Sequence, residues 1–504
     1  MRTHRVIVIG AGIGGLVAAL ELAHRGIAVT LIERAAAPGG KMRQVAIGAR
    51  LLDAGPTVFT MRWVFEEIFS AAGSSLAEHV LLHPATILAR HAWSAGERLD
   101  LFSEVERSAA AIGDLAGAKE ARGYRAFCAR ARQIYDTLEH SFIRAERRGP
   151  VGLALAVGPR GLGDLWRIAP FKTMWSALGE YFADPRLHQL FGRYATYCGS
   201  SPFLAPATLM LVAHVEREGV WQIEGGMHAL AVALANLAAA RGVVFRYGET
   251  VAEICVSGGR ATGVRLTSGE QIDVDAVIAN ADVAAIGGGL LGAGAAASVT
   301  APKRHERSLS AMTWTVVAEA EGGSGGFPLV RHNVFFSRDY EAEFAALFRR
   351  GRIPDAPTVY VCAQDRDGRN GSAEGGAERL FCLINAPATG DTEQFDELRV
   401  EACARAMFER LEQCGLRLKR QPERSAIVTT PADFHRMFPG TGGALYGRAS
   451  HGWAASFRRP SSRSRLPGLY LAGGSTHPGP GVPMAALSGR LAATSILADF
   501  ASTR

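Results

Sequence analysis

Residues 5–20, RVIVIGAGIGGLVAAL, decide the fold of this 504-residue chain. Val6 to Ile9 form an apolar run typical of a buried parallel strand, a glycine-rich turn follows, and apolar residues then recur at helical spacing. The turn contains the pattern GxGxxG: Gly10 permits the sharp turn, Gly12 lets the backbone approach a pyrophosphate, and Gly15 lets the helix pack close to the strand. The stretch therefore predicts a dinucleotide site with phosphates at a helix N-terminus.

A second strand supports this interpretation. Residues 28–32, AVTLI, read as a strand and are followed by Glu33, at the distance expected for a carboxylate that binds the adenosine ribose. A carboxylate at this position disfavours a 2′-phosphate, so FAD or NAD is favoured over NADP.

Two further turns distinguish FAD from NAD. Behind the second strand stand the glycine pair Gly39–Gly40 and the cations Lys41 and Arg43, and residues 52–58, LDAGPTV, supply another turn. A nicotinamide dehydrogenase has little use for a second phosphate-side loop so close to the first. An extended FAD needs backbone donors and positive charge along its diphosphate and ribityl chain, so FAD is predicted.

These motifs, Gly10-x-Gly12-x-x-Gly15, Glu33, Gly39-Gly40-Lys41 and Asp53-x-Gly55-Pro56-Thr57, resemble the phytoene-desaturase type of FAD-dependent oxidoreductase within the amine-oxidase superfamily. Arg commonly follows the glycine pair in that family, and Lys41 departs from it. Lys keeps the positive charge of Arg but lacks its bidentate guanidinium, so Lys41 and Arg43 are both candidates for the cation that contacts FAD. The resemblance also implies that the backbone near Val251 touches adenine. The candidate cofactor-binding residues are Gly10, Gly12, Gly14, Gly15, Glu33, Arg34, Gly40, Lys41, Gly55, Pro56, Thr57, Val251, Gly473, Gly474 and Met484.

The last of these lie in residues 472–490, AGGSTHPGPGVPMAALSGR. We expect residues 469–472 to form the last parallel strand of the FAD domain, and Gly473 and Gly474 to let the backbone pass close to the ribityl chain. Pro483 suits the first turn of a helix, whose N–H groups near Met484 would face the flavin pyrimidine edge. His477 is predicted to line the cavity rather than to act as the catalyst.

The expected fold class is α/β, with a Rossmann-like FAD-binding domain assembled from residues 1–74, 216–284 and 431–504. Residues 75–215 are expected to form a helical insertion that contacts substrate and membrane. Residues 285–430 are expected to form a substrate domain of antiparallel sheet plus helices, whose sheet is the floor of an apolar cavity.

Charge and cysteine content say little about the function of the protein. Lys plus Arg exceeds Asp plus Glu by 55 − 48 = 7, an excess that suits an anionic membrane or a nucleic acid but is spread along the chain, and no nucleic-acid partner is expected. Seven cysteines show no CxxC pair or metal-ligand spacing, so we expect reduced thiols and no metal site.

Membrane contact is expected at residues 147–175, where short apolar runs alternate with Arg, Lys and Trp as at a headgroup boundary. A cap domain that packs its own Trp residues would explain the same pattern. Residues 283–302 carry no charge, but their five glycines favour a turn and short helix over a membrane span. The expected location is peripheral, on the cytoplasmic side of the cell membrane, as suits a hydrophobic substrate.

Within the family, residues 332–344, 357–366 and 438–447 resemble the hydroxycarotenoid 3,4-desaturases, also called methoxyneurosporene dehydrogenases. This resemblance implies FAD-dependent introduction of a C-3,4 double bond into an acyclic 1-hydroxy- or 1-methoxy-carotenoid, by hydride transfer to flavin. The alternatives are a phytoene desaturase, a carotenoid cis-trans isomerase, a non-catalytic lipid-binding flavoprotein and a soluble amine oxidase.

No residue is assigned as catalytic from the sequence, and the electron acceptor stays open. The candidate proton acceptors are His214, Glu216, Glu218, His228 and His477, each of which also fits a solvated or structural role. No Ser-His-Asp arrangement, HExxH motif or zinc spacing offers a competing mechanism.

Overall fold

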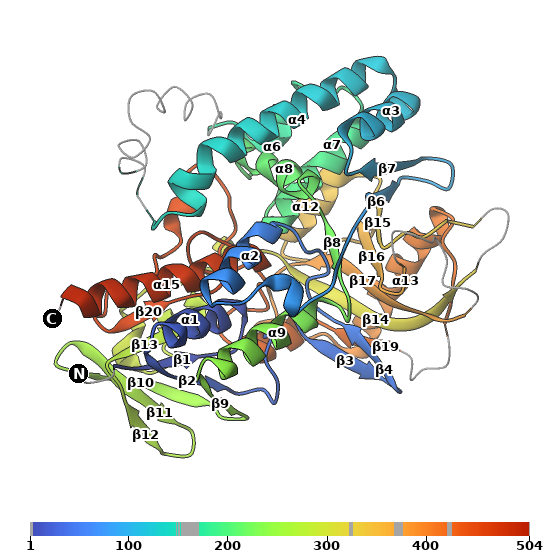
Figure 1. Cartoon of the computed structure of the whole chain (residues 1–504). Coiled ribbons are helices and arrows are strands. Elements are labelled where there is room, and N and C mark those ends of the chain that lie inside the picture. The colour runs from blue at the N-terminus through green and yellow to red at the C-terminus, as the bar shows by residue number, and fades with distance from the viewer. Residues whose placement is uncertain are drawn as a thin grey trace.

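A parallel five-stranded sheet forms the centre of the nucleotide-binding part in the computed structural model, which describes residues 4–147, 149, 152, 171–321, 326–366, 376–420 and 426–502. The strand order is β20-β13-β1-β2-β9, so the sheet combines N-terminal, central and C-terminal segments (Figure 1). The bounds are β1 Arg5–Ile9, β2 Ala28–Glu33, β9 Val244–Tyr247, β13 Ala276–Ala279 and β20 Leu469–Leu471.

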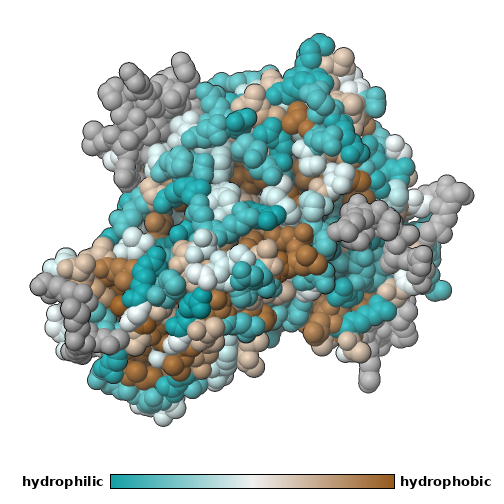
Figure 2. Space-filling view, in the orientation of Figure 1, coloured by the Kyte–Doolittle hydropathy of each residue, from teal (hydrophilic) through white to brown (hydrophobic). Residues whose placement is uncertain are grey.

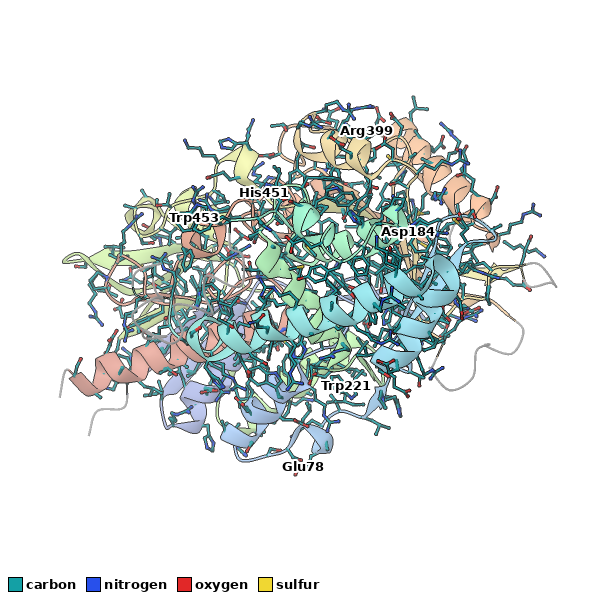
Figure 3. All side chains as sticks on the ribbon, turned by 90° about the horizontal axis from the view of Figure 1, so that it is seen from above. Glu78, Asp184, Trp221, Arg399, His451 and Trp453 are labelled. Carbon is teal, nitrogen blue, oxygen red and sulfur yellow. The ribbon has the colours of Figure 1, made fainter. Side chains whose placement is uncertain are left out.

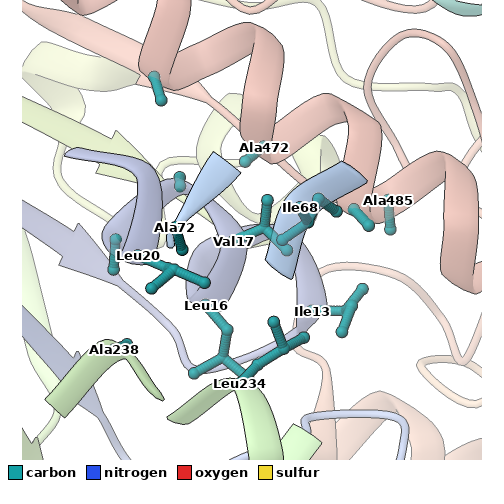
Figure 4. Close-up of a cluster of buried hydrophobic side chains, with 14 of the residues drawn as sticks. Ile13, Leu16, Val17, Leu20, Ile68, Ala72, Leu234, Ala238, Ala472 and Ala485 are labelled. Carbon is teal, nitrogen blue, oxygen red and sulfur yellow. The ribbon is translucent and has the colours of Figure 1, made fainter. Parts of the chain in front are cut away.

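Helices cover one face of this sheet and a small three-stranded sheet covers the other. The helices are α1 Ile13–His24, α2 Arg62–Ala71, α9 Met227–Ala240 and α15 Val482–Ser502, and the small sheet is β10 Val251–Ser257, β11 Arg260–Leu266 and β12 Gln271–Asp273. In the core, Leu16 and Leu20 of α1 pack with Ile68 of α2 and Leu234 of α9 (Figure 4). Full burial of each such side chain stabilises the folded state by about 1.5–3 kcal/mol, and this packing holds α1 in place behind the glycine turn.

A second, eight-stranded sheet has the order β18-β14-β17-β16-β15-β6-β7, with β19 paired to β14. Its strands are β6 Ile87–Ala92, β7 Arg98–Phe102, β14 Ser310–Ala320, β15 His332–Phe335, β16 Val359–Ala363, β17 Glu378–Ala386, β18 Leu418–Arg420 and β19 Ala426–Thr429. The pairs are antiparallel except that β15 and β6 run parallel. The pairs within residues 285–430 are all antiparallel, as predicted, and the parallel pair joins β15 to β6 from an earlier segment.

The helical part starts later than the expected boundary at residue 75. Strands β5 (Leu82–Pro84), β6 and β7 precede the long helices, and β6 and β7 extend the large sheet, so the expected helical insertion is wrong for residues 82–102. Pairing with β15, some 240 residues further along the chain, holds these strands, and local sequence does not reveal such a partner. The helical elements are α3 Val105–Ala116, α4 Ala118–Leu138, η2 Glu139–Ile143, α6 Met174–Leu178, α7 Pro185–Gly192, η3 Arg193–Cys198, η4 Ala207–Met210 and α8 Leu211–Arg217.

Smaller elements connect these parts. They are β3 Gln44–Ile47, β4 Arg50–Asp53, η1 Leu76–Glu78, β8 Trp221–Ile223, α10 Val283–Gly287, α11 Ala293–Ala296, η5 Arg304–Glu306, α12 Tyr340–Phe348, α13 Glu397–Gln413, α14 Pro431–Met437 and η7 Ala455–Arg458. In the described part of the chain, no helix combines the length and apolar content that crossing a membrane requires. Polar residues cover much of the face seen in Figure 2, with apolar residues gathered mainly toward the lower left and near the centre.

Candidate functional site

One continuous cavity of about 1310 Å³ lies between the two large sheets. Its walls come from the first glycine turn, the loops after β2 and β4, the helical part, the floor strands β14, β16 and β17, and the start of α15. Pockets for drug-sized ligands measure roughly 300–1,000 Å³. The volume therefore suits a large cofactor together with an apolar substrate.

The glycine turn closes one end of the cavity. Gly10 has φ +98° and lines the wall together with Gly12 and Gly14. A Cβ on Gly12 would lie 2.6 Å from the Asn280 side chain, and one on Gly14 would lie 2.9 Å from the Ala485 carbonyl oxygen. Gly15 lies behind the wall, where a Cβ would collide with the Gly10 carbonyl oxygen, so this glycine sets the packing of α1 against β1.

Sequence reasoning missed Asn280, which lines the cavity and donates from Nδ2 to the Gly10 carbonyl at 3.3 Å. It directly follows β13, the parallel neighbour of β1. The signal was present in the sequence, because ligands of open α/β sheets bind beyond the carboxyl ends of neighbouring parallel strands.

Glu33 ends β2 as a buried carboxylate on the cavity wall. It accepts the N–H groups of Ala11 at 2.7 Å and Ala35 at 2.8 Å, which fix its orientation. Each carboxylate oxygen can still accept a hydrogen bond from a ribose hydroxyl. Arg34 and Val251 line the cavity at the same end.

The glycine-pair loop carries a cation into the cavity. Gly40 has φ +58°, and a Cβ there would lie 3.3 Å from the Gly12 Cα atom, so the two glycine turns approach closely. Lys41 lines the cavity and donates from Nζ to the Leu445 carbonyl oxygen at 2.5 Å. Burial lowers the pKa of Lys41.

Arg43, the second cation candidate, also lines the cavity, but its side chain donates to Thr429 Oγ1 at 2.9 Å. Burial lowers the pKa of Arg43 as well. Both candidate cations therefore border the cavity.

Gly55, Pro56 and Thr57 also line the cavity. A Cβ on Gly55 would collide with the Lys41 carbonyl oxygen, so the two loops are in direct backbone contact. Thr57 Oγ1 lies 2.7 Å from the hydroxyl of Tyr360 on β16, which connects this loop to the floor sheet.

Gly473 and Gly474 line the cavity after β20, and Gly473 has φ +112°. The helix α15 begins at Val482, and the lining residues near its start include Pro483 and Ala485. Met484 does not line the cavity: its side chain packs against the apolar core.

The prediction that His477 lines the cavity is wrong. His477 is 1% exposed, Nε2 lies 2.9 Å from the Ala145 carbonyl oxygen, and its ring packs edge-on against Phe142 at 4.7 Å. The residue is directed toward the end of the helical part instead of the cavity. Burial lowers the pKa of His477 to about 4.

Of the other candidate proton acceptors, Glu216 and His228 line the cavity, while His214 and Glu218 do not. His228 Nε2 lies 3.0 Å from the Pro38 carbonyl oxygen, beside the glycine pair. Glu216 accepts hydrogen bonds from the hydroxyls of Tyr194 and Tyr197.

The floor and roof of the cavity are mainly apolar. They include several residues to which sequence reasoning gave no role in the cavity: Val58, Arg193, Tyr197, Val212, Val215, Thr313, Tyr340, Tyr360, Phe381, Leu383 and Asn385. Val58, Tyr340 and Tyr360 lie in stretches named from the sequence, but only the three-dimensional fold brings the whole set together.

Comparison with known proteins agrees with this geometry. The family model "Flavin containing amine oxidoreductase" matches residues 13–292 and 336–497. The chain is 55% identical over 504 residues to a hydroxyneurosporene desaturase of Rubrivivax gelatinosus, covering 100% of this chain and 95% of that protein. It is 45% identical to a hydroxyneurosporene desaturase of Cereibacter sphaeroides, covering 99% and 98%.

A crystal structure of an oxidoreductase from Methanosarcina mazei shares the fold, with a TM-score of 0.58 and 16% identity over 98% of this chain and all of that one. FAD fits the residues present: glycines whose Cβ positions are occupied, a fixed carboxylate at Glu33, and the cations Lys41 and Arg43 border one elongated cavity. FAD is the cofactor of this enzyme, and the chain belongs to the flavin-containing amine oxidoreductase family.

Proposed function

We propose that this protein is an FAD-dependent desaturase that introduces the C-3,4 double bond into an acyclic 1-hydroxy- or 1-methoxy-carotenoid, in carotenoid biosynthesis of the spheroidene or spirilloxanthin type. The observation that carries the proposal is the full-length identity of 55% and 45% to two hydroxyneurosporene desaturases. The match covers the glycine turns, the helical part and the floor sheet, so it includes the whole cavity.

The cavity supplies what such a reaction needs from the protein. FAD, when bound, supplies the hydride acceptor. The apolar side chains of Val212, Val215, Phe381 and Leu383 line the same cavity as Thr57, where they exclude water and hold an extended polyene. Orientation of the reacting carbons is the main contribution that this wall can make.

Peripheral attachment to the cytoplasmic side of the cell membrane is part of the proposal. An apolar patch of Phe171, Leu204 and Trp453 supports it, because these side chains are 63%, 47% and 47% exposed. The rings of Phe171 and Trp453 lie 5.5 Å apart, and the Leu204 carbonyl accepts the N–H of Gly452. Figure 3 shows Trp453 near His451. Such a surface suits the acyl boundary of a bilayer.

The patch also lies near one end of the cavity. Phe203, next to Leu204 in the chain, packs on Trp175 at 4.5 Å, and Trp175 packs on the cavity-lining Tyr340 at 6.0 Å. We infer that a polyene enters from the membrane on this side. Most of the segment 147–175, where the sequence predicts headgroup contact, lies outside the described residues.

The test is turnover of 1-hydroxyneurosporene. The purified FAD-loaded protein is mixed anaerobically with the carotenoid in lipid vesicles, and the flavin and carotenoid spectra are recorded together. Flavin bleaching with a red shift of the carotenoid is expected, because conjugation grows by one double bond. A changed isomer without loss of two hydrogens would instead indicate the isomerase, and binding without any change would indicate a lipid-binding flavoprotein.

A further inference from the structure

A charged cluster interrupts the apolar wall of the cavity. It consists of Arg193 and Tyr197 on η3 and Glu216 on α8, all of which line the cavity. The Tyr197 hydroxyl donates to Glu216 Oε1 at 2.9 Å, and the Tyr194 hydroxyl donates to the other carboxylate oxygen. Burial raises the pKa of Glu216, while these two hydrogen bonds and Arg193 act in the opposite direction.

The guanidinium of Arg193 has few protein partners. Its one hydrogen bond among the described residues is a long one, 3.4 Å from Nη1 to the Tyr197 hydroxyl, and no described carboxylate lies within 4.0 Å. Its carbon lies 5.3 Å from the Tyr197 ring centroid and 5.5 Å from that of Tyr360. Arg193 is partly buried and faces the cavity with unused N–H donors, so an acceptor atom of a ligand would stabilise its charge there.

Tyr197 offers the complementary group. Tyr197 lines the cavity, and because its O–H donates to Glu216, its oxygen can act only as an acceptor, for which Arg193 at 3.4 Å is a distant donor. Arg193 can donate and Tyr197 can accept at the same point of the wall. A hydroxyl group needs both kinds of partner, whereas an ether oxygen needs a donor alone.

We propose that Arg193, Tyr197 and Glu216 form a subsite for the oxygen at C-1 of the polyene, with Glu216 as the positioning residue that fixes the Tyr197 hydroxyl. This inference rests on the proposed desaturase function and deepens it. It orders three ligands by affinity: the hydroxylated polyene binds tightest, its methyl ether binds less tightly, and the hydrocarbon, which leaves Arg193 without an acceptor, binds weakest.

The position of the cluster agrees with the chemistry. Arg193 lies over Tyr360, and the Tyr360 hydroxyl is 2.7 Å from Thr57 Oγ1 in the predicted flavin-contact loop. One carbon separates C-1 from C-3 in the substrate. An oxygen held at Arg193 therefore keeps the reacting carbons near Thr57.

The test measures affinity without turnover. Wild type, Arg193→Met, Tyr197→Phe and Glu216→Gln are loaded with FAD and reduced with dithionite. Quenching of tryptophan fluorescence in detergent micelles then gives the Kd of 1-hydroxyneurosporene, its methyl ether and neurosporene. Tyr181→Phe is the matched control, since Tyr181 belongs to the same helical part but does not line the cavity. FAD content and circular dichroism check the fold of each variant.

We expect wild type to bind the hydroxylated polyene about ten- to hundredfold tighter than neurosporene, as for a hydrogen bond to a charged group. Arg193→Met should reduce this preference to within about threefold, Tyr197→Phe and Glu216→Gln should remove the preference for hydroxyl over methoxy, and Tyr181→Phe should change neither. If Arg193→Met fails to fold, the affinities of Tyr197→Phe decide whether the subsite exists, because this substitution nearly keeps the side-chain volume.

Two results separate this inference from the proposed function. A wild type that desaturates 1-hydroxyneurosporene but binds all three polyenes equally, or folded variants that keep the wild-type preference, would overturn the subsite and leave the desaturase intact. A wild type that prefers the hydroxylated polyene but does not oxidise it would overturn the desaturase and leave the subsite intact. A protein that binds none of them would overturn both.

Discussion

Gly15 packs the first turn of α1 directly against the backbone of the glycine turn that follows β1. A Cβ there would collide with the Gly10 carbonyl oxygen, so α1 would have to move away from β1. For Gly15→Ala we expect the free energy of unfolding to fall by about 1–3 kcal/mol, as overpacking does, together with loss of FAD. Thermal unfolding and the flavin absorbance per chain measure both quantities.

Gly96→Ala is the control, because nothing lies within 4 Å of the position that its Cβ would take. Its stability and FAD content should equal those of wild type. A Gly15→Ala protein that keeps full FAD and stability would show that the close contact between helix and strand is not needed.

His477 makes stability depend on pH. Its folded pKa is about 4 because of burial, whereas an unfolded histidine has a pKa of about 6.5. Below pH 6.5 the unfolded chain therefore binds a proton that the folded chain does not. Stability should fall as the pH decreases from 6.5 toward 4, by about 1.4 kcal/mol per pH unit for one proton.

His477→Gln removes this proton uptake, so urea unfolding of the variant should show a smaller pH slope in that window. The other histidines whose pKa is lowered, His91, His214, His332 and His451, are unchanged in the variant, so the difference between the two slopes isolates His477. Equal slopes would mean that His477 is protonated equally in the folded and unfolded chains.

At the scale of elements, the carboxylate of Asp53 links β4 to α9. Its Oδ2 accepts the N–H of Met227, the first residue of α9, at 2.6 Å. Gln364 holds the Asp53 backbone with two hydrogen bonds, so the loop that contains Gly55 is fixed from both sides. Asp53→Ala should cost about 1–2 kcal/mol, as the loss of a helix cap does, and should weaken FAD binding.

Asp184→Ala is the matched control, because Asp184 accepts the Arg186 N–H at the start of α7, outside the cavity. Its stability should fall by a comparable amount while the Kd for FAD, titrated into the apoprotein, stays unchanged. An equal loss of FAD affinity in both variants would contradict the specific role of Asp53.

The elements also show which parts of the fold a sequence can predict. The strand and helix around Gly10 are encoded locally, by apolar periodicity and the glycine turn, and were predicted. Strands β6 and β7 were not, because β6 is held by its parallel partner β15. No cavity role was predicted for Arg193 or Tyr360 for the same reason: they come from η3 and β16, which only the three-dimensional fold brings together.

For the whole molecule, the exposed patch of Phe171, Leu204 and Trp453 is the proposed membrane-binding surface. Leu204→Ser with Trp453→Ser should reduce binding to vesicles by about tenfold or more, because two apolar side chains no longer enter the bilayer. Co-sedimentation with vesicles that contain anionic lipid measures the partition. FAD content should stay at the wild-type level.

Leu398→Ser is the control, because Leu398 is 76% exposed but lies on α13, outside the patch. Its vesicle binding should equal that of wild type. If Leu398→Ser lowers binding as much as the double variant does, the protein does not bind through the proposed patch.

The central claim is that one cavity brings a polyene and FAD together for the removal of two hydrogens. It is tested most directly by a single anaerobic turnover of 1-hydroxyneurosporene carrying deuterium at both positions of C-3 and C-4, with the product analysed by mass spectrometry. The account predicts that each of these carbons loses one deuterium for every flavin reduced. A product that retains all of its deuterium, with the flavin still oxidised, would contradict it.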